Sequence, residues 1–578
     1  MKSKTAKVLG ISSYYHDSAA VLIEDGEIIA ASHEERFSRK KNDASFPFNS
    51  IRFCLDYRGI DLMDLEGVVF YEKPLLKFER LLETYLDNAP QGVQQFTKSM
   101  PVWLSEKAYM KEMIFFELNK IQPIKKDQLK IYFSNHHLSH AASAFYPSPY
   151  ENAAILTVDG VGEWATASIS HGIGNSIRVL KEILFPHSLG LLYSAFTYFL
   201  GFKVNSGEYK LMGLSPYGNK DSGEVQKYMN LIKSNLVHVF EDGSLILNLD
   251  CFDYQTGLKM IKEDKWEKIF GFSVRKPESR LAQEHCDLAL AIQLITNDIV
   301  NKMARTAKTL TGNQNICLAG GVALNCVSNG KLEKENIFNG IWVQPSPGDA
   351  GGALGAALAF HHMVLKRERR VGIYIDSMKG SYLGPEFSGL DVQKLIRKTE
   401  AQTSFYDNFD GLCADVARLL SQGNVVGWFQ GRMEWGPRSL GNRSILGDAR
   451  NPEMQKKLNL KIKFREGFRP FAPAVLFEDV ENFFETKKPS PYMLFVHDVG
   501  HNQRNPLPAE YDKFSITDKL YFVRSTVPAI THIDYSARIQ TVHKETNFRF
   551  WSLLKNFKDQ TSCPVIENLS YSAGNGFL

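Results

Sequence analysis

The sequence lacks the features that define several broad classes of protein. None of its seven cysteines forms a Cys-x-x-Cys pair, and a scattered, odd-numbered set in a long chain indicates reduced thiols rather than a disulfide framework. The longest apolar stretch, residues 189–202, is interrupted by Ser194 and Thr197 and is too short to cross a bilayer. Residues 1–4 lead directly into a strand-like segment without the apolar core of a signal peptide. We therefore expect a cytoplasmic protein that does not enter a membrane.

The chain also lacks a strong charge of either sign. Its formal net charge is +4 and no basic domain stands out, which argues against a dedicated nucleic-acid-binding protein. Hydrophobic residues make up 44% and charged residues 23% of the 578 positions, a balance typical of globular proteins that are long enough for two or more domains. A charged segment with Gly, Ser and Pro predicts a linker at 366–390, between domains at 1–365 and 391–578.

Two histidines that lie four residues apart, His136 and His140, form the most informative motif. On a helix they share one face, where two imidazoles can bind one metal ion. Such a pair alone is slightly more often incidental, but Asp159 and Asp349 each follow an apolar strand and add carboxylates. This donor set suits a divalent transition metal such as iron, zinc or manganese. We therefore predict a metal site of His136, His140, Asp159 and Asp349.

The strand pattern predicts a duplicated α/β fold. Strands are expected at 8–11, 18–23 and 27–31, with an acidic turn after the first, and the segment 155–169 repeats the order strand, acidic turn, strand. In the actin, sugar-kinase and Hsp70 ATPase folds, two such halves bind a nucleotide between them.

Helical spacing predicts a mostly helical insertion at 61–129 and a long helix at 286–310. A strand at 316–319 runs into Gly320 and Gly321, a turn that is either structural or lets the backbone approach a phosphate or ribose closely.

The C-terminal part contains two loops rich in cations, at 427–443 and 461–473. Arginine binds carboxylate and phosphate in a bidentate manner, and lysine adds a point charge. These cations alternate with aromatic residues and proline rather than with Glu at i,i+4, which favours a site for a compact polyanion, such as ATP or an acyl phosphate, over a solvated basic face.

Several ordered motifs make the chain resemble, almost end to end, the O-carbamoyltransferase family. That family includes the nodulation-factor, cephem, aminoglycoside, ansamycin and paralytic shellfish toxin carbamoyltransferases. The motifs are GISSYYHDSAA (10–20), EERFSRKK (34–41), HHLSHAA (136–142), SGEYKLMGLSPYG (206–218), LAGGVALN (318–325), PGDAGG (347–352) and the segments 434–444 and 462–473. The resemblance implies an actin-like (ASKHA) N-terminal domain similar to the tRNA threonylcarbamoyl-transferring subunit. It implies a C-terminal α/β domain similar to threonylcarbamoyl-AMP synthase.

The resemblance implies ATP-dependent carbamoyl transfer in two steps. The C-terminal domain would convert carbamoyl phosphate and ATP into carbamoyl-adenylate, and the N-terminal domain, with Fe²⁺ or another divalent metal, would transfer the carbamoyl group to a hydroxyl of a small-molecule natural product. Catalytic roles would fall to His16, Asp17 and, as a tentative base, Asp250. Ligand contacts would come from Lys40, Lys41, Gly320, Gly321, Asn325, Arg438, Arg443, Lys463, Arg469, Arg538 and Ser570. Lys40 and Lys41 are equally compatible with solvated side chains.

Two positions depart from the family pattern. Asn42 replaces a common histidine, and the last segment matches imperfectly, with Glu567 in an expected apolar strand and the chain ending at Leu578. A shortened or altered C-terminus is one interpretation, in which adenylate formation is weakened or a single domain stays active; the sequence leaves open whether adenylate formation is retained.

Three other functions compete with carbamoyl transfer. A metabolite kinase would release ADP, a tRNA-threonylcarbamoylating enzyme would need a basic face, and a non-catalytic scaffold would not need these motifs together. We expect neither nucleic-acid nor membrane partners; a homodimer is compatible with the sequence, which leaves the oligomeric state and the acceptor open.

Overall fold

The computed structural model describes residues 5–103, 109–372, 375–463 and 466–570. The chain forms two compact units, Met1–Ser377 and Met378–Leu578, and their boundary falls within the expected linker at 366–390. Part of that segment is anchored to the first unit, because Arg369 donates hydrogen bonds to the carbonyl oxygens of Phe145, Tyr146, Ser148 and Tyr150 at 2.6–3.0 Å. Among the helices described, none is sufficiently long and apolar to span a membrane.

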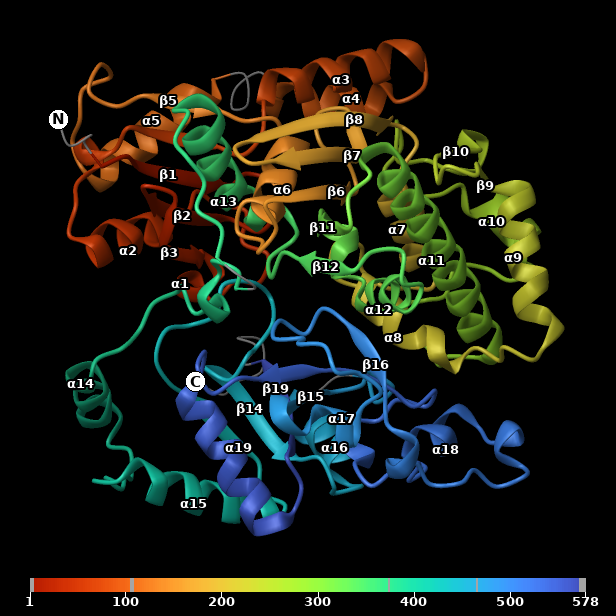
Figure 1. Cartoon of the computed structure of the whole chain (residues 1–578). Helices are drawn as coiled ribbons and strands as arrows, with labels where there is room; N and C mark the ends of the chain where they lie inside the picture. Colours follow the sequence, from red (N-terminus) through yellow and green to blue (C-terminus); the bar gives the residue numbers. More distant parts are fainter. Residues whose placement is uncertain (1–4, 104–108, 373–374, 464–465, 571–578) are drawn as a thin grey trace. The chain divides into compact units, whose positions relative to one another are not determined.

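The first half of unit 1 contains a five-stranded sheet in the order β3-β2-β1-β4-β5 (Figure 1). Strands β1, β2 and β3 are antiparallel neighbours, whereas β4 and β5 run parallel to β1. The strands are β1 Lys7–Ser12, β2 Ala19–Glu24, β3 Glu27–His33, β4 Gly67–Phe70 and β5 Ile131–Phe133. The strands predicted at 18–23 and 27–31 form the hairpin β2–β3, which turns at Asp25-Gly26, where Gly26 adopts a φ of +83°.

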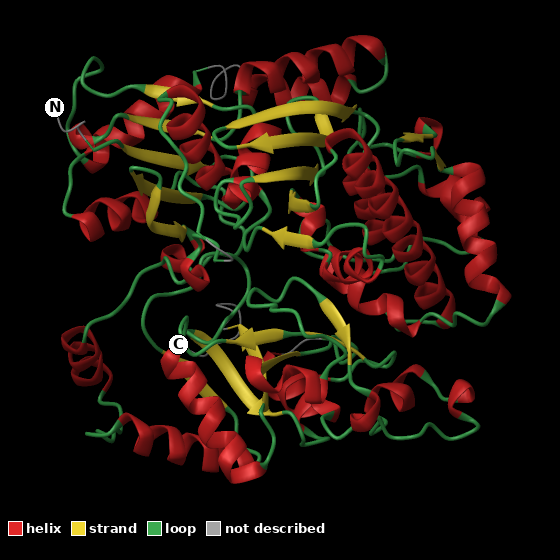
Figure 2. Ribbon diagram, in the orientation of Figure 1, coloured by secondary structure: helices red, strands yellow, loops and turns green. Residues whose placement is uncertain are grey.

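The second half of unit 1 repeats this topology with the sheet β12-β11-β6-β7-β8 (Figure 2). Strands β6, β7 and β8 are antiparallel, and β11 and β12 run parallel to β6. The strands are β6 Asn152–Val158, β7 Ala165–Ile173, β8 Ser176–Leu184, β11 Asn315–Ala319 and β12 Gly340–Val343. The predicted duplicated, actin-like α/β fold is therefore confirmed.

Each sheet's last parallel strand leads into a helix, and these two helices pack against each other. Helix α6, His136–Phe145, follows β5 but packs on β6 and β11, whereas α13, Asp349–Ala359, follows β12 but packs on β1 and β2. A Cβ on Gly355 would lie 1.6 Å from the Ser139 carbonyl oxygen, and one on Gly10 would lie 1.9 Å from that of Ala353. Glycine therefore permits the close approach of α13 to both α6 and β1.

Substituting Gly355→Ala should destabilise unit 1 by about 1–3 kcal/mol, because the new methyl group overlaps backbone that cannot move without separating α6 from α13. Thermal unfolding followed by circular dichroism measures the effect. Gly223→Ala, at the start of helix α9 (Gly223–Asn235) with nothing within 4 Å, is the matched control. Equal melting temperatures for the two variants would contradict the packing argument.

Other helices of unit 1 complete the connections between strands. The expected helical insertion contains α3, α4 and α5, but 61–129 also includes the short strand β4, which that prediction missed. The predicted long helix is confirmed as α11, Gln283–Thr311. The remaining elements are α1 Glu35–Ser38, α2 Phe48–Arg58, α3 Pro74–Asp87, α4 Val93–Val102, α5 Met110–Ile121, α7 Leu189–Phe199, α8 Glu208–Leu214, α10 Glu263–Phe270, α12 Cys326–Lys334, β9 Val237–Val239 and β10 Leu245–Leu247.

Unit 2 is built on a five-stranded sheet in the order β13-β14-β19-β15-β18, in which only β15 and β18 are parallel neighbours. The strands are β13 Val426–Phe429, β14 Arg443–Asp448, β15 Ala472–Leu476, β18 Gln540–Val542 and β19 Val565–Ser570, with β16 Val496–Asp498 paired to β17 Ser536–Arg538. The helices are α14 Gly389–Thr399, α15 Phe409–Ser421, α16 Met454–Lys457, α17 Val480–Phe483, α18 Ile516–Tyr521 and α19 Phe548–Thr561. Strand β19 forms despite Glu567, whose side chain is buried within it.

Candidate metal centre

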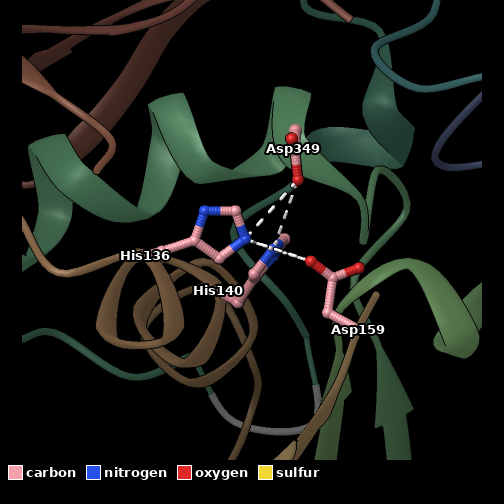
Figure 3. A group of neighbouring side chains, drawn as sticks. All are labelled: His136, His140, Asp159 and Asp349. Atoms are coloured by element: carbon pink, nitrogen blue, oxygen red, sulfur yellow. Dashed lines mark hydrogen bonds and ion pairs between the residues drawn. The ribbon is translucent and has the colours of Figure 1, made fainter. Parts of the chain in front are cut away.

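Four side chains from both halves of unit 1 converge as the sequence predicted: His136, His140, Asp159 and Asp349 (Figure 3). One ligand atom from each lies within 4.8 Å of the others, and among the described residues this is the one such group. The Nε2 atom of His136 is 3.0 Å from both Asp159 Oδ2 and His140 Nε2. Asp349 Oδ1 lies 3.6 Å from each of the two Nε2 atoms.

The duplicated topology explains this convergence. His136 begins α6 and His140 lies one helical turn later, so both imidazoles face the same direction. Asp349 begins α13, the corresponding helix of the other half, and Asp159 directly follows β6. The starts of α6 and α13 and the end of β6 therefore meet between the two halves of unit 1. Together these three elements contribute the four polar side chains of the group.

The donor set fits a divalent cation. The two Nε2 atoms face each other at 3.0 Å, so they cannot both carry a proton, and a shared cation would satisfy both lone pairs. Burial lowers the pKa of His136, but Asp159 and Asp349 outweigh that effect and hold it well above its usual value. Burial likewise opposes ionisation of Asp159, yet hydrogen bonds from the two histidines hold its pKa well below the usual range. The site therefore favours anionic carboxylates, the form that binds metal.

His16 and Asp17 lie beside this cluster. His16 Nε2 is 3.7 Å from Asp349 Oδ2, and its Nδ1 is 3.0 Å from Asp17 Oδ2. Burial would lower the pKa of His16, but the Asp349 carboxylate and the contact with Asp17 raise it to about 9. A protonated imidazole next to the cluster can stabilise a phosphate or another leaving anion.

The Gly320-Gly321 turn also reaches the cluster. Gly320 has a φ of +87°, and a Cβ there would lie 2.2 Å from the Val158 carbonyl oxygen, so glycine is required. The backbone N–H of Gly321 donates to Asp159 Oδ1 at 2.9 Å. Asn325 lies further along, where its side chain caps α12 through the Ser328 N–H and pairs with Gln293. Contact with a bound ligand stays a prediction for these three residues.

Other predicted residues of unit 1 lie on the surface. Asp250 is exposed in a short 3₁₀ turn, and no interaction with the cluster is found for it within the described part of the chain. Lys40 and Lys41 are exposed after α1. Their catalytic and phosphate-binding roles stay predictions.

The strand register of unit 2 brings most of the predicted anion-binding residues to one end of its sheet. Arg443 begins β14, and Ser570, which ends the antiparallel neighbour β19, pairs with the next residue, Ser444. Arg469 shortly precedes β15, and Arg538 shortly precedes β18; these two strands start at the same end as β14. Lys463 Nζ donates to the Ser570 carbonyl oxygen.

The loop between Glu434 and Arg443 contains Arg438 and is tied together by a residue that the sequence did not indicate. Glu434 Oε2 lies 3.2 Å from Arg443 Nε, and Glu434 Oε1 accepts from the backbone N–H groups of Leu440 and Asn442. Since this carboxylate neutralises part of the arginine charge and fixes the loop, Glu434 shapes the basic site without belonging to it.

Three buried charged residues near His136 were not predicted from the sequence: Glu72, Lys77 and Glu163. Glu163 accepts hydrogen bonds from the backbone N–H groups of His136 and Lys73. Glu72 directly follows Tyr71 after β4, the same signal of a carboxylate behind an apolar strand that identified Asp159. This pattern is present in the sequence, but it lies inside the segment 61–129, which was predicted to be mostly helical.

Comparisons with known proteins define the class. Residues 7–358 match the family described as Carbamoyltransferase N-terminus, and residues 417–576 match Carbamoyltransferase C-terminus. The chain therefore belongs to the carbamoyltransferase family and is an enzyme of that class.

The chain is also similar to individual known proteins. The chain is 53% identical over 567 residues to an uncharacterized protein of Synechocystis sp., which covers 98% of this chain and 91% of the relative. It is 34% identical over 568 residues to Nodulation protein NolNO of Sinorhizobium fredii, covering 97% and 75% of the two chains. Among solved structures, HypF of T. kodakarensis aligns with 65% of this chain and 50% of its own at 13% identity and a TM-score of 0.32.

Proposed function

We propose that the protein is an ATP-dependent O-carbamoyltransferase that forms carbamoyl-adenylate in unit 2 and uses it in unit 1. The observation that carries this proposal is the buried group of His136, His140, Asp159 and Asp349, in a chain that matches both halves of the family. A metabolite kinase on the same duplicated fold would leave the basic end of the unit 2 sheet without a role.

In unit 2, the cations at the end of the sheet would bind carbamoyl phosphate and ATP. Water would release phosphate from carbamoyl phosphate, and an oxygen of the resulting carbamate would attack the α-phosphorus of ATP, so that pyrophosphate leaves. Arg438, Arg443 and Lys463 would neutralise the charge that accumulates on the phosphates, with Arg469 and Arg538 completing the site and Ser570 contributing from the end of β19.

In unit 1, a hydroxyl oxygen of the acceptor would attack the carbamoyl carbon, and the bond to the AMP oxygen would break. A divalent ion such as Fe²⁺, held by His136, His140, Asp159 and Asp349, would supply Lewis acidity toward the mixed anhydride. His16 would keep a proton at Nε2, directed toward the leaving phosphate, and Asp17 would orient its imidazole. The hydroxyl proton would pass to a base; Asp250 is exposed, so we retain it only as the predicted candidate.

The acceptor would be a small molecule with a free hydroxyl, in the class of natural products. Support comes from the relatives named as nodulation proteins, which align over nearly the whole chain. The reaction would give a carbamate ester and AMP.

The test is product analysis with ATP, carbamoyl phosphate and Fe²⁺ but no acceptor. Pyrophosphate should appear only when carbamoyl phosphate is present, and Arg438→Ala should slow its release roughly 10- to 100-fold, because a charge-assisted hydrogen bond contributes about 1.5–3 kcal/mol. Lys487→Ala, an exposed cation of the same unit paired with Glu481, is the control and should keep wild-type rates. ADP as the nucleotide product would contradict the proposal and favour a kinase.

A further inference from the structure

A buried ion pair lies directly behind the candidate metal ligand His136. Glu72 is 3% exposed and Lys77 is 6% exposed. Lys77 Nζ lies 2.8 Å from Glu72 Oε2, which is in turn 3.5 Å from His136 Nδ1. Glu72 therefore faces the ring nitrogen of His136 that points away from Asp159 and His140.

The position of Glu72 matches a need of the metal site. A metal ion at Nε2 requires a neutral imidazole that carries its proton at Nδ1, and a carboxylate behind Nδ1 favours that tautomer and fixes the ring plane. Within the described ranges neither His136 Nδ1 nor His140 Nδ1 has a hydrogen-bond partner, and Glu72 is the one carboxylate at ion-pair distance from His136 Nδ1. Glu72 thus acts on one of the two histidine ligands.

Lys77 explains how a third carboxylate is tolerated next to the site. The two ligand carboxylates would balance one divalent ion, and Lys77 offsets the charge of Glu72 through the 2.8 Å contact between Nζ and Oε2. Lys77 Nζ also lies 4.6 Å from the centroid of the Tyr15 ring, which holds the ammonium group in place. The ion pair keeps Glu72 available to accept a hydrogen bond rather than to bind the metal itself.

Glu163 has a different task from Glu72. It accepts from the backbone N–H of His136 at 3.0 Å and from that of Lys73 at 2.7 Å, so it fixes the start of α6. The backbone and the ring of His136 are therefore held by separate carboxylates.

We propose that Glu72 is the positioning residue that sets the tautomer and orientation of His136 for metal binding, with Lys77 as its charge partner. This inference rests on the proposed metal site. It assigns Glu72 an effect on metal affinity and ligand field that the carboxylate at Glu163 does not share.

The experiment titrates the full-length, metal-free protein with Co²⁺, whose visible absorption reports the ligand geometry. Glu72→Gln should bind Co²⁺ about 10- to 100-fold more weakly, with a changed absorption band. The double variant Glu72→Gln/Lys77→Met removes the unpaired lysine charge and should bind equally weakly while melting closer to the wild type. Glu34→Gln, which replaces an equally buried carboxylate that caps α2, should leave Co²⁺ binding unchanged.

The outcomes separate this inference from the proposed function. Stoichiometric Co²⁺ binding by the wild type, lost in Asp349→Asn, supports the metal site itself. Weakened binding in both Glu72 variants then supports the positioning role. Wild-type affinity and absorption in the double variant would overturn that role while leaving the metal site intact. If the wild type binds no Co²⁺, both the metal site and the inference fail.

Discussion

Asp349→Asn should abolish carbamoyl transfer while leaving adenylate formation intact. The substitution keeps the shape of the side chain but removes one of two negative charges from a donor set whose atoms lie within 4.8 Å of one another. Since a bound metal contributes several kcal/mol of transition-state stabilisation, we expect transfer to fall roughly 10²- to 10⁴-fold. Two assays on the same preparation measure this: carbamate ester formation with a hydroxyl acceptor, and pyrophosphate release without one.

Because the two proposed reaction steps belong to different units, only one of the two activities should fall. Pyrophosphate release should stay within about twofold of the wild type, because Asp349 belongs to unit 1 and the cations proposed for adenylate formation belong to unit 2. Asp287→Asn, another buried aspartate of unit 1, which accepts from Asn219 N–H and Gln283, is the matched control and should retain both activities. A parallel loss of both activities in Asp349→Asn would contradict the assignment of the two steps to separate sites.

The sequence was sufficient to predict the convergence of these four side chains because each of them obeys a local rule. His136 and His140 share the helical period, and Asp159 and Asp349 each follow an apolar strand. The same rule would have identified Glu72, but β4 is only four residues long and lies next to long helices, so its strand character was lost in the helical pattern around it. Short strands carry little periodic signal, and their ends are missed with them.

The partners of Glu72 could not be predicted from local pattern at all. Lys77 lies near it in sequence, but His136 belongs to a helix that follows a different strand. In unit 2 the sheet order β14-β19-β15-β18 is not the sequence order, so the sequence could suggest a polyanion site but not which cations share one end of the sheet. Asp250 is the opposite case. It was proposed only from the family resemblance, without support from a local sequence pattern, and its side chain is exposed in the structure.

Glu434→Ala should destabilise unit 2 by about 3–5 kcal/mol and abolish pyrophosphate release. The Glu434 side chain is fully buried, and its Oε2 lies 3.2 Å from Arg443 Nε. Its Oε1 accepts from the backbone N–H groups of Leu440 at 2.8 Å and Asn442 at 2.9 Å. Truncation leaves a buried guanidinium without its counter-charge and two backbone donors without an acceptor, and breaking a buried pair in this way carries a cost of that size.

Two substitutions of Glu434 distinguish its role in holding the loop from its role as the counter-charge of Arg443. Glu434→Gln keeps an oxygen for Leu440 and Asn442 but removes the partner of Arg443, so it should retain more stability than Glu434→Ala while still impairing pyrophosphate release. Thermal unfolding and the pyrophosphate assay measure the two effects, with Glu478→Ala as a control that removes the acceptor of an exposed hydrogen bond from Trp551. If Glu434→Ala unfolds at the wild-type temperature, the carboxylate does not hold the loop, and the cations of unit 2 must be positioned by the strand register alone.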